Sequence, residues 1–321
     1  MPLPPALEGR LAIPAVAAPM FLVSGPDLVV EACRAGVLGT FPALNQRSSE
    51  GYAAWLTEIE SRLQALPRHA PYGVNLIVHN TNQRLAADLD LTVKHKVPVV
   101  ITSLGAVRGL VDRVHGYGGL VFHDVINLRH ARKAAEAGVD GLILVCAGAG
   151  GHAGTLSPLA FIPEVRRLFS GTILLSGCIS SGDQIAASLA LGADLAYLGT
   201  RFIATRESLA EDGFKTMICQ SQAADIVYTD FVSGVHGSFL RPSIAAAGLD
   251  PDNLPSKKDI DFGKELDPEH RKKKAWKNIW SAGQGVGSID DVPSTAALCA
   301  RLKAEYAAAL DRLAARRTAL A

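Results

Sequence analysis

Short apolar runs alternate with longer amphipathic stretches over the first two thirds of the chain. Between Leu11 and about Thr205, eight runs are rich in apolar or β-branched residues, and segments with apolar positions at helical spacing separate them. The predicted strands are residues 15–18, 37–41, 72–76, 98–102, 120–125, 141–146, 172–176 and 195–199. The runs are apolar on both sides, which is typical of a parallel sheet buried under helices. Eight βα units favour an α/β fold of the closed (β/α)8 type, a TIM barrel, over an open doubly wound sheet.

The segments between these runs carry signals for helix starts and ends. Ser181 and Gln184 have the spacing of a capping box, and Ser157 followed by a proline indicates an N-cap with proline at the first helical position. Gly138 and Gly192 follow alanine-rich stretches and are predicted to end two helices.

The pattern changes after Glu207. Prolines recur there, charges cluster over residues 257–277, and several aromatic residues need burial: Phe231, Phe239, Trp276 and Trp280. We therefore expect a smaller inserted substrate or cap domain at residues 206–284, over the mouth of a barrel domain formed by residues 1–205 and 285–321. A final helix is predicted from about residue 292 to 315.

The composition excludes some classes of partner. The chain has 321 residues, 48% of them hydrophobic, and a net charge of +1, which gives no support for nucleic acid or an anionic membrane as partner. The N-terminus lacks a signal-peptide pattern, and no apolar run reaches the ~18 residues of a membrane span. The five cysteines are scattered without a CxxC pair, which indicates neither a zinc site nor a disulfide framework and makes a cytoplasmic location the simplest expectation.

Small-residue turns follow the last three predicted strands. Residues 146–155 form a glycine-rich loop, strand seven ends in Ser176-Gly-Cys178, and strand eight ends in Gly199-Thr200. Glycine lets backbone N–H groups approach an anion, and a helix N-terminus adds favourable partial charge. The turns after strands seven and eight of a TIM barrel commonly bind phosphate. These two turns are therefore predicted to bind a phosphate group, and simple packing of strand against helix is the alternative.

His152 is the main catalytic candidate. It lies in the glycine loop beside the predicted phosphate site, and an imidazole suits proton abstraction or hydrogen bonding to an anionic substrate. A surface or packing histidine is the alternative. The glycines of this loop loosely match a dinucleotide-binding fingerprint. However, residues 155–158 separate them from the next helix, and the unit is the sixth rather than the first, so we reject a Rossmann site.

Two polar residues close earlier strands. The amide of Asn75 at the end of strand three is placed to hydrogen-bond a ligand, with turn capping as the alternative. Asp124 follows His123 at the end of strand five, where it could hold a cofactor hydroxyl, orient a histidine or cap the next helix. No lysine lies at the carboxyl end of a strand, which argues against a Schiff-base aldolase. No His/Asp/Glu cluster has the spacing of metal ligands, so no metal is expected.

Four segments follow one another along the chain: Ala18-Pro-Met20, Gly73-Val-Asn75, Gly150-Gly-His152, and residues 199–207, which read Gly-Thr-Arg-Phe-Ile-Ala-Thr-Arg-Glu. In this order they resemble the nitronate monooxygenase (2-nitropropane dioxygenase-like) family of FMN enzymes. Each segment alone is modest evidence, but the ordered set is specific. The resemblance implies an FMN-bound barrel with a smaller substrate domain after strand eight.

The resemblance also assigns roles to single residues. The position matching His152 acts as a base or substrate contact in nitronate oxidation. Gln284 and Gly285 resemble the loop that returns to the flavin. The positions that the resemblance places along the FMN are Pro19, Met20, Asn75, Gly177, Cys178, Gly199 and Thr200. From their places at the strand ends and in the glycine loop we also expect contact with the cofactor from Ala18, Asp124, Gly150, Gly151 and Ser176.

Two departures from the family pattern bear on the chemistry. Members often read Gly-x-Glu-Ala-Gly-Gly-His, whereas this chain has Cys146 for the first glycine and Gly148 for the glutamate. Some members place a lysine against the flavin where this chain has Asp124, and a carboxylate would not stabilise an anionic reduced flavin. Both changes weaken the link to nitronates more than the link to FMN. The family also includes NADH:quinone and enoyl-thioester reductases.

The leading hypothesis is therefore an FMN-dependent oxidoreductase that oxidises alkyl nitronates with O₂. The alternative is an NAD(P)H-dependent flavin reductase acting on an enoyl or ring CoA thioester or a quinone. For it, basic residues such as Lys272, Lys273 and Lys274 would contact phosphates, although a solvated basic face is the simpler interpretation of that cluster. A flavin-free barrel lyase or binding module is the least favoured alternative. A small-molecule substrate and a homodimer are expected, without nucleic acid or membrane.

Overall fold

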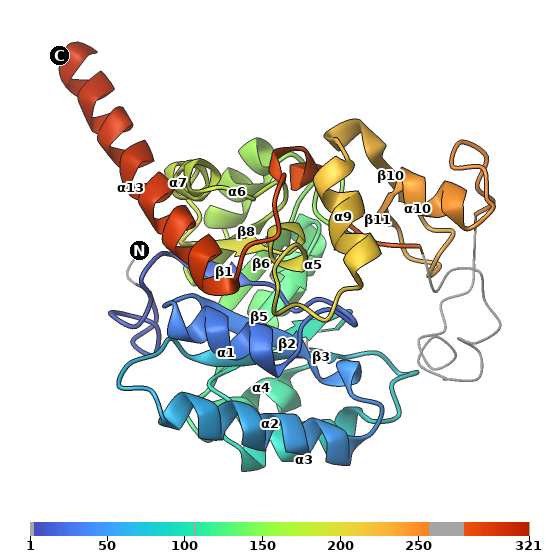
Figure 1. Ribbon diagram of the computed structural model, residues 1–321. Helices are drawn as coiled ribbons and strands as arrows, with labels where there is room; N and C mark the ends of the chain where they lie inside the picture. The colour runs from blue at the N-terminus through green and yellow to red at the C-terminus, as the bar shows by residue number, and fades with distance from the viewer. Residues whose placement is uncertain (1–2, 106, 257–278, 321) are drawn as a thin grey trace.

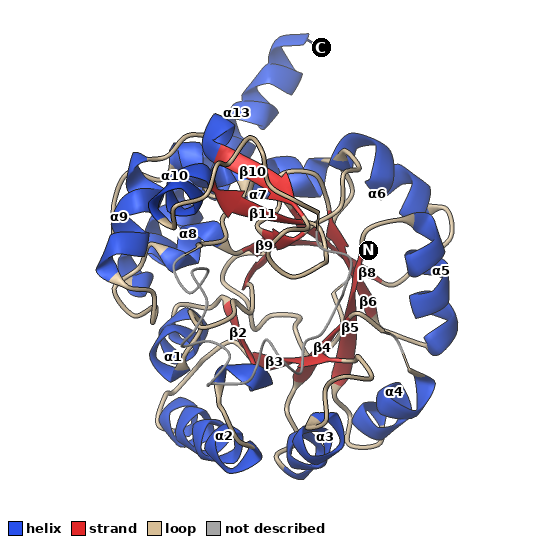
Figure 2. Cartoon of the chain, turned by 90° about the vertical axis from the view of Figure 1, so that its right-hand side faces the viewer, coloured by secondary structure: helices blue, strands red, loops and turns tan. Residues whose placement is uncertain are grey.

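Eight parallel strands close into a barrel in the computed structural model, which describes residues 3–105, 107–256 and 279–320. Figure 2 shows the ring of strands inside a ring of helices. The barrel strands are β1 (Ala15–Ala17), β2 (Leu38–Pro42), β3 (Tyr72–Ile77), β4 (Val99–Ser103), β5 (Leu120–Val125), β6 (Gly141–Val145), β8 (Thr172–Ser176) and β9 (Leu195–Leu198). β9 pairs with β1 and closes the ring. The predicted TIM barrel is confirmed, with every strand boundary within one residue of its prediction.

Helices fill the gaps between the strands, as predicted. They are α1 (Pro26–Arg34), α2 (Ser49–Gln64), α3 (Leu85–Lys94), α4 (Arg108–His115), α5 (Leu128–Ala137), α6 (Pro158–Arg166), α7 (Gly182–Ala190) and the short α8 (Thr200–Ile203), with a 3₁₀ turn, η1 (Ala43–Asn45), before α2. The Ser181–Gln184 capping box is present. Gly138 and Gly192 follow their helices with φ of +90° and +105°, as expected for glycines that end helices. Ser157 is the N-cap of α6, but its side chain makes no capping hydrogen bond.

Two aspartates in equivalent positions connect helices α4 and α6 to the amino-terminal ends of barrel strands. Gly138 and Gly192 are each followed, two residues later, by an aspartate that begins the next strand segment. Asp140 accepts a hydrogen bond from the backbone N–H of Val121 at 2.7 Å and pairs with His115. Asp194 likewise accepts from the N–H of Ile173 and pairs with Arg166. The same local sequence therefore fixes both helix–strand junctions.

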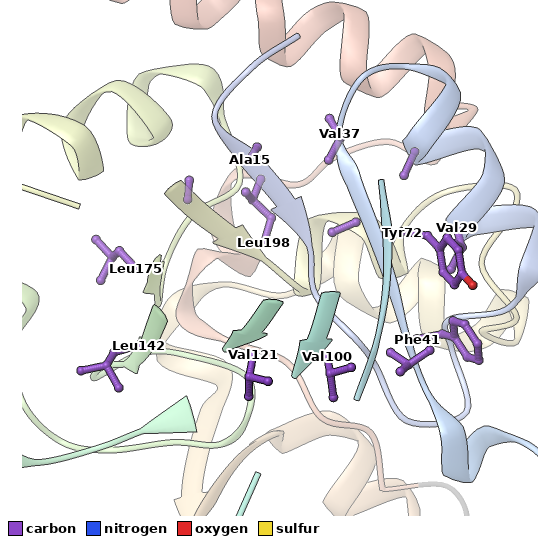
Figure 3. Close-up of a cluster of buried hydrophobic side chains, with 14 of the residues drawn as sticks. Ala15, Val29, Val37, Phe41, Tyr72, Val100, Val121, Leu142, Leu175 and Leu198 are labelled. Carbon is purple, nitrogen blue, oxygen red and sulfur yellow. The ribbon is translucent and has the colours of Figure 1, made fainter. Parts of the chain in front are cut away.

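The core has two layers, because successive residues of a strand point to opposite faces. One layer lies between the sheet and the helices and includes Phe41, Val100 and Leu142, which Figure 3 shows outside the ring of strands. The other fills the inside of the barrel and includes Ile101 and Phe122. Residues that share the parity of the inner layer and lie near the carboxyl ends of the strands therefore face the barrel mouth.

The chain after α8 forms a small additional sheet with helices beside it. β10 (Ile226–Thr229) pairs with β11 (Gly237–Leu240), and β11 also pairs with β7 (Gly151–His152), which comes from the loop after β6. The accompanying elements are α9 (Asp212–Gln220), η2 (Ala223–Asp225), α10 (Arg241–Ala246) and η4 (Gln284–Ser288). Domain boundaries at 206 and 284 remain a prediction. Residues 257–277, Trp276 among them, lie outside the described residues. Phe239 is buried as expected, whereas Phe231 and Trp280 are only half-buried.

The final helix, α13 (Thr295–Leu320), begins and ends later than predicted. Pro293 keeps the preceding chain extended, and its carbonyl accepts a hydrogen bond from the N–H of Arg206. The helix then starts at Thr295, whose N–H and hydroxyl both donate to Glu207 at 2.8 Å. Its first half packs against α7 and α1, and its end projects from the body (Figure 1).

Candidate active site

The predicted site residues gather at the barrel mouth, which is the end formed by the carboxyl ends of the parallel strands. The first strand contributes Ala18, Pro19 and Met20, and the third and fifth contribute Asn75 and Asp124. The last two contribute Ser176, Gly177, Cys178, Gly199 and Thr200. The glycine loop with Gly150, Gly151 and His152 follows β6 at the same end. The sequence spreads these residues over nearly 200 positions, and the closed barrel brings them to one face.

The glycine loop is fixed by the segment that follows the barrel. His152 is the register partner of Gly237, and Gly151 is the partner of Ser238, across the antiparallel β7–β11 pair. The N–H of Gly151 also donates to the Ser281 hydroxyl at 2.7 Å. His152 therefore belongs both to a barrel loop and to the additional sheet. Nothing in the local sequence of residues 146–155 indicates this pairing.

The imidazole of His152 is held by a serine from the additional sheet region. Its Nε2 lies 2.8 Å from the Ser233 hydroxyl. Desolvation by the surrounding protein lowers the pKa of His152 to about 4, although the residue as a whole is exposed to solvent. The ring is thus neutral near pH 7, and a neutral imidazole can accept a proton or donate one N–H to an anion. Ser233 was not among the residues expected from the sequence.

A second loop returns to the mouth beside the glycine loop. The N–H of Gln284 donates to the carbonyl of Gly148 at 2.8 Å, and the N–H of Gly283 donates to the Thr200 hydroxyl at 2.9 Å. A Cβ on Gly283 would lie 2.5 Å from the carbonyl oxygen of Gly148, so only glycine allows this approach. The Ser180 hydroxyl donates to the carbonyl of Gly285 at 3.0 Å. Residues 283–285 therefore meet the turns after β6, β8 and β9. The approach of Gln284 and Gly285 to a flavin stays a prediction.

The turn after β8 has a backbone conformation that L-residues rarely adopt. Gly177 has φ of +136°, and Cys178 follows with φ of +57°. A cysteine in the left-handed region costs about 1 kcal/mol. Gly285 packs closely on this turn, since a Cβ there would lie 3.1 Å from the carbonyl carbon of Cys178. Burial raises the pKa of the Cys178 thiol, so it is protonated near pH 7 and is not an activated nucleophile.

The turn after β9 has free space beside it. A Cβ placed on Gly199 would have no protein atom closer than 3.9 Å, the nearest being Ala18 Cβ and Met20 Sδ. Its φ of −102° is one that any residue adopts. Gly199 is therefore not required by packing or by backbone conformation, which is consistent with space kept for a ligand.

Three polar residues from adjacent strands form a line inside the mouth. The Asn75 amide donates to the Ser103 hydroxyl at 2.8 Å, and that hydroxyl donates to Asp124 Oδ2 at 2.5 Å. Burial raises the pKa of Asp124 to about 6, and the hydrogen bond from Ser103 partly opposes the shift. Asp124 Oδ1 is buried and has no hydrogen-bond partner among the described residues. Ser103 was not identified from the sequence, where it is one of many serines.

Two residues near the mouth could not be interpreted from the sequence alone. His123 precedes Asp124 but faces the helices, and its Nδ1 lies 2.7 Å from the Thr102 hydroxyl. It therefore does not belong to the site. Asn45, which the sequence did not mark, donates to the carbonyls of Met20 and Ser24 at 3.0 and 2.8 Å. This asparagine holds the loop after β1 in place.

The described residues contain no group of three His, Cys, Asp or Glu side chains arranged to hold a metal ion. In the same ranges, no helix combines the length and apolar character that crossing a membrane requires.

Comparison with known proteins identifies relatives over most of the chain. The profile of the nitronate monooxygenase family matches residues 9–305. A nitronate monooxygenase from Paraburkholderia phytofirmans is 27% identical, and the alignment covers 94% of each chain. A dehydrogenase of 5-hydroxy-7a-methyl-1-oxo-octahydro-1H-indene-4-carboxyl-CoA from Mycobacterium tuberculosis is 28% identical over 72% of this chain, but only 64% of that protein's length is covered.

Solved structures agree with this relationship. A nitroalkane oxidase from Streptomyces ansochromogenes superposes with a TM-score of 0.82 at 25% identity, covering 96% of this chain and 99% of that one. FabK from Thermotoga maritima shares the fold with a TM-score of 0.80 at 23% identity, covering 97% of each chain. The resemblance seen in the sequence is thus confirmed over nearly the whole barrel. The chain belongs to the nitronate monooxygenase family and is an oxidoreductase.

Proposed function

We propose that this protein is an FMN-dependent oxidoreductase that oxidises alkyl nitronates with O₂. The observation that carries the proposal is the position of His152, a neutral imidazole in the glycine loop after β6, fixed at the barrel mouth by its pairing with the additional sheet and by Ser233. The match to a nitronate monooxygenase over 94% of both chains supports the substrate class.

The geometry of the mouth supports FMN as the cofactor. The turns carrying Gly177 and Gly199 would hold the phosphate through backbone N–H groups, and the space beside Gly199 would receive it. The line formed by Asn75, Ser103 and Asp124 offers polar groups to the ring. FMN supplies the two-electron redox chemistry that no side chain provides.

The protein's part in the reaction is to position and deprotonate the substrate. Neutral His152 would take the proton from the carbon next to the nitro group, which leaves the electron pair on the nitronate. The new nitronate anion beside the imidazolium raises the pKa of His152 in the complex, because opposite charges favour each other. With a substrate that is already a nitronate, the same ring would donate an N–H to the anion. Ser233 fixes the orientation of the ring.

Replacing Gly199 by valine tests the cofactor site without disturbing the fold. Since a Cβ there meets no protein atom within 3.9 Å, the variant should unfold at the parental urea concentration. Its isopropyl group would occupy the proposed phosphate space and weaken FMN binding at least about tenfold, or about 1.4 kcal/mol. Flavin fluorescence titration measures this. Gly109→Val, at an exposed helical glycine, is the control and should bind FMN normally. Parental affinity in Gly199→Val would place the phosphate elsewhere.

Anaerobic stopped-flow spectroscopy tests the activity itself. The FMN-loaded protein is mixed separately with propionate 3-nitronate, NADH and NADPH. Loss of flavin absorbance with the nitronate alone supports the proposal. Rapid loss with a pyridine nucleotide alone would identify a reductase instead.

A reductase or dehydrogenase of CoA thioesters is the second candidate, and Asp124 favours it. A carboxyl group replaces the lysine that some family members place against the flavin, and the M. tuberculosis relative carries a CoA-thioester name. On this alternative, neutralising Lys272, Lys273 and Lys274 should raise the substrate KM strongly. These lysines lie outside the described residues, so kinetics alone can decide.

A further inference from the structure

The polar line at the barrel mouth points into the barrel. Ser103 and Asp124 have the same parity as Ile101 and Phe122, which fill the barrel interior. Asn75 alternates with Val74, which lies between sheet and helices. The side chains of Asn75, Ser103 and Asp124 therefore share the inner face of three adjacent strands, β3, β4 and β5.

Only one of the two carboxyl oxygens of Asp124 has a hydrogen-bond partner among the described residues. Oδ2 accepts from Ser103, whereas Oδ1 is buried without a partner among the described residues. Two other titratable groups belong to the surroundings of this carboxyl. Burial, and to a smaller extent the negative charge of Asp124, raises the pKa of Tyr197 on β9. His123 precedes Asp124 on β5 but faces the helices. No cation contacts Asp124 in the described part of the chain. A buried ionised carboxylate without a second donor or a counter-charge costs several kcal/mol.

A protonated carboxyl removes this cost and changes the chemistry that the group offers. Because Oδ2 already accepts from Ser103, the proton belongs on Oδ1. Oδ1 then becomes a hydrogen-bond donor that needs an acceptor inside the mouth. A flavin ring presents carbonyl oxygens and ring nitrogens, which are acceptors, and a carboxylate would repel them.

We propose that Asp124 binds the flavin ring in its protonated form, donating a hydrogen bond from Oδ1, so that flavin affinity falls when Asp124 ionises. This inference rests on the proposed function, because it needs a flavin at the mouth. It also explains the departure from the family's lysine. The chain keeps a donor at this position and gives up the positive charge.

The proposal predicts a pH dependence with a definite sign. The free protein's Asp124 has its pKa near 6, and a bound acceptor raises that pKa further by favouring the protonated form. Affinity is then constant below about pH 6 and falls above it, by about tenfold for each unit by which binding raises the pKa. FMN's own phosphate loses its second proton near pH 6, which would obscure this change. Riboflavin, which has no phosphate, is therefore the probe.

The experiment is a fluorescence titration of the flavin-stripped full chain with riboflavin from pH 5 to 8.5. Parental protein should lose about tenfold in affinity between pH 6 and 8. Asp124→Asn keeps a neutral donor and should retain the affinity seen at low pH across the whole range. Ser103→Ala removes a hydrogen bond that stabilises the carboxylate, so the fall should move to higher pH. Asp90→Asn, at an exposed aspartate on α3, should reproduce the parental profile.

The outcomes separate this inference from the proposed function. Parallel pH profiles for the parental protein and Asp124→Asn, with riboflavin bound, would overturn the role of Asp124 alone. Failure of the parental protein to bind either riboflavin or FMN at any pH would overturn both.

Discussion

Replacing His152 by alanine is expected to lower the turnover of neutral nitroalkanes by about 100- to 10,000-fold while FMN stays bound. The loss follows because His152 is the group at the mouth that is neutral near pH 7 and placed to take a proton. The phosphate is assigned to the turns that carry Gly177 and Gly199 and not to His152, so cofactor affinity should change little. Steady-state oxygen consumption with nitroethane, and flavin content by absorbance, measure the two effects.

Preformed nitronates separate proton abstraction from binding. With propionate 3-nitronate the proton is already gone, so the variant should lose far less activity, and mostly through KM. Ser233→Ala is the matched control, because it removes the hydrogen bond to Nε2 but leaves the base. Its turnover of nitroethane should fall less than that of His152→Ala. Equal rates of nitroethane oxidation by the parental protein and His152→Ala would disprove the assignment.

The lowered pKa of His152 fixes the pH dependence of the same reaction. The free enzyme needs the neutral imidazole, which loses its proton above a pKa of about 4. kcat/KM for nitroethane should therefore be insensitive to this group above about pH 5.5 and fall tenfold per unit below about pH 4. A histidine with an ordinary pKa would instead produce a fall between pH 7 and 6.

The barrel was predictable because its signals are local. Each strand is a short apolar run, and the chain order of the units also fixes which strands are neighbours. Capping residues such as Ser181 and the glycines after α5 and α7 act within one helical turn, so the sequence displays them directly. The strand ends then follow, and with them the approximate positions of Asn75, Asp124 and Gly199.

The partners of these residues were not predictable, because they lie far away in the chain. Ser233 reaches His152 through the pairing of the two-residue strand β7 with β11, and so short a strand has no alternating pattern. Asn45 and Ser103 act through single hydrogen bonds to other strand ends. Strand parity, which turns His123 away and Asp124 inward, also depends on a register that no local signal gives.

Arg201 illustrates the same limit within a motif. It belongs to the segment 199–207 that resembles the family, yet it does not face the mouth. Its side chain is 1% exposed. One guanidinium nitrogen, Nη2, donates to the carbonyls of Ala204 and Asp291 at 2.8 Å, while Nη1 pairs with the Asp291 carboxylate at 3.1 Å. Helix α8 directly follows Gly199. Arg201 therefore links this helix, through Asp291, to the segment that leads into α13.

Arg201→Met is expected to lower the free energy of unfolding by about 2–4 kcal/mol, measured by urea denaturation of the flavin-free protein. The substitution keeps apolar volume but removes the donor to the buried carbonyl of Ala204 and to the partly buried carbonyl of Asp291. The cost stays below that of breaking a fully buried pair, because Asp291 is 41% exposed and keeps Arg301 as a partner.

Arg301→Met is the matched control, since Arg301 binds the same carboxylate from an exposed position on α13. Exposed ion pairs contribute about 0–1 kcal/mol, so this variant should unfold at nearly the parental urea concentration. Equal losses in the two variants would show that the Asp291 ion pair, and not the buried carbonyl contacts, holds α8. If the carbonyl contacts dominate, Arg201→Met should also weaken FMN binding, because the Thr200 hydroxyl that fixes the return loop is on the same short helix.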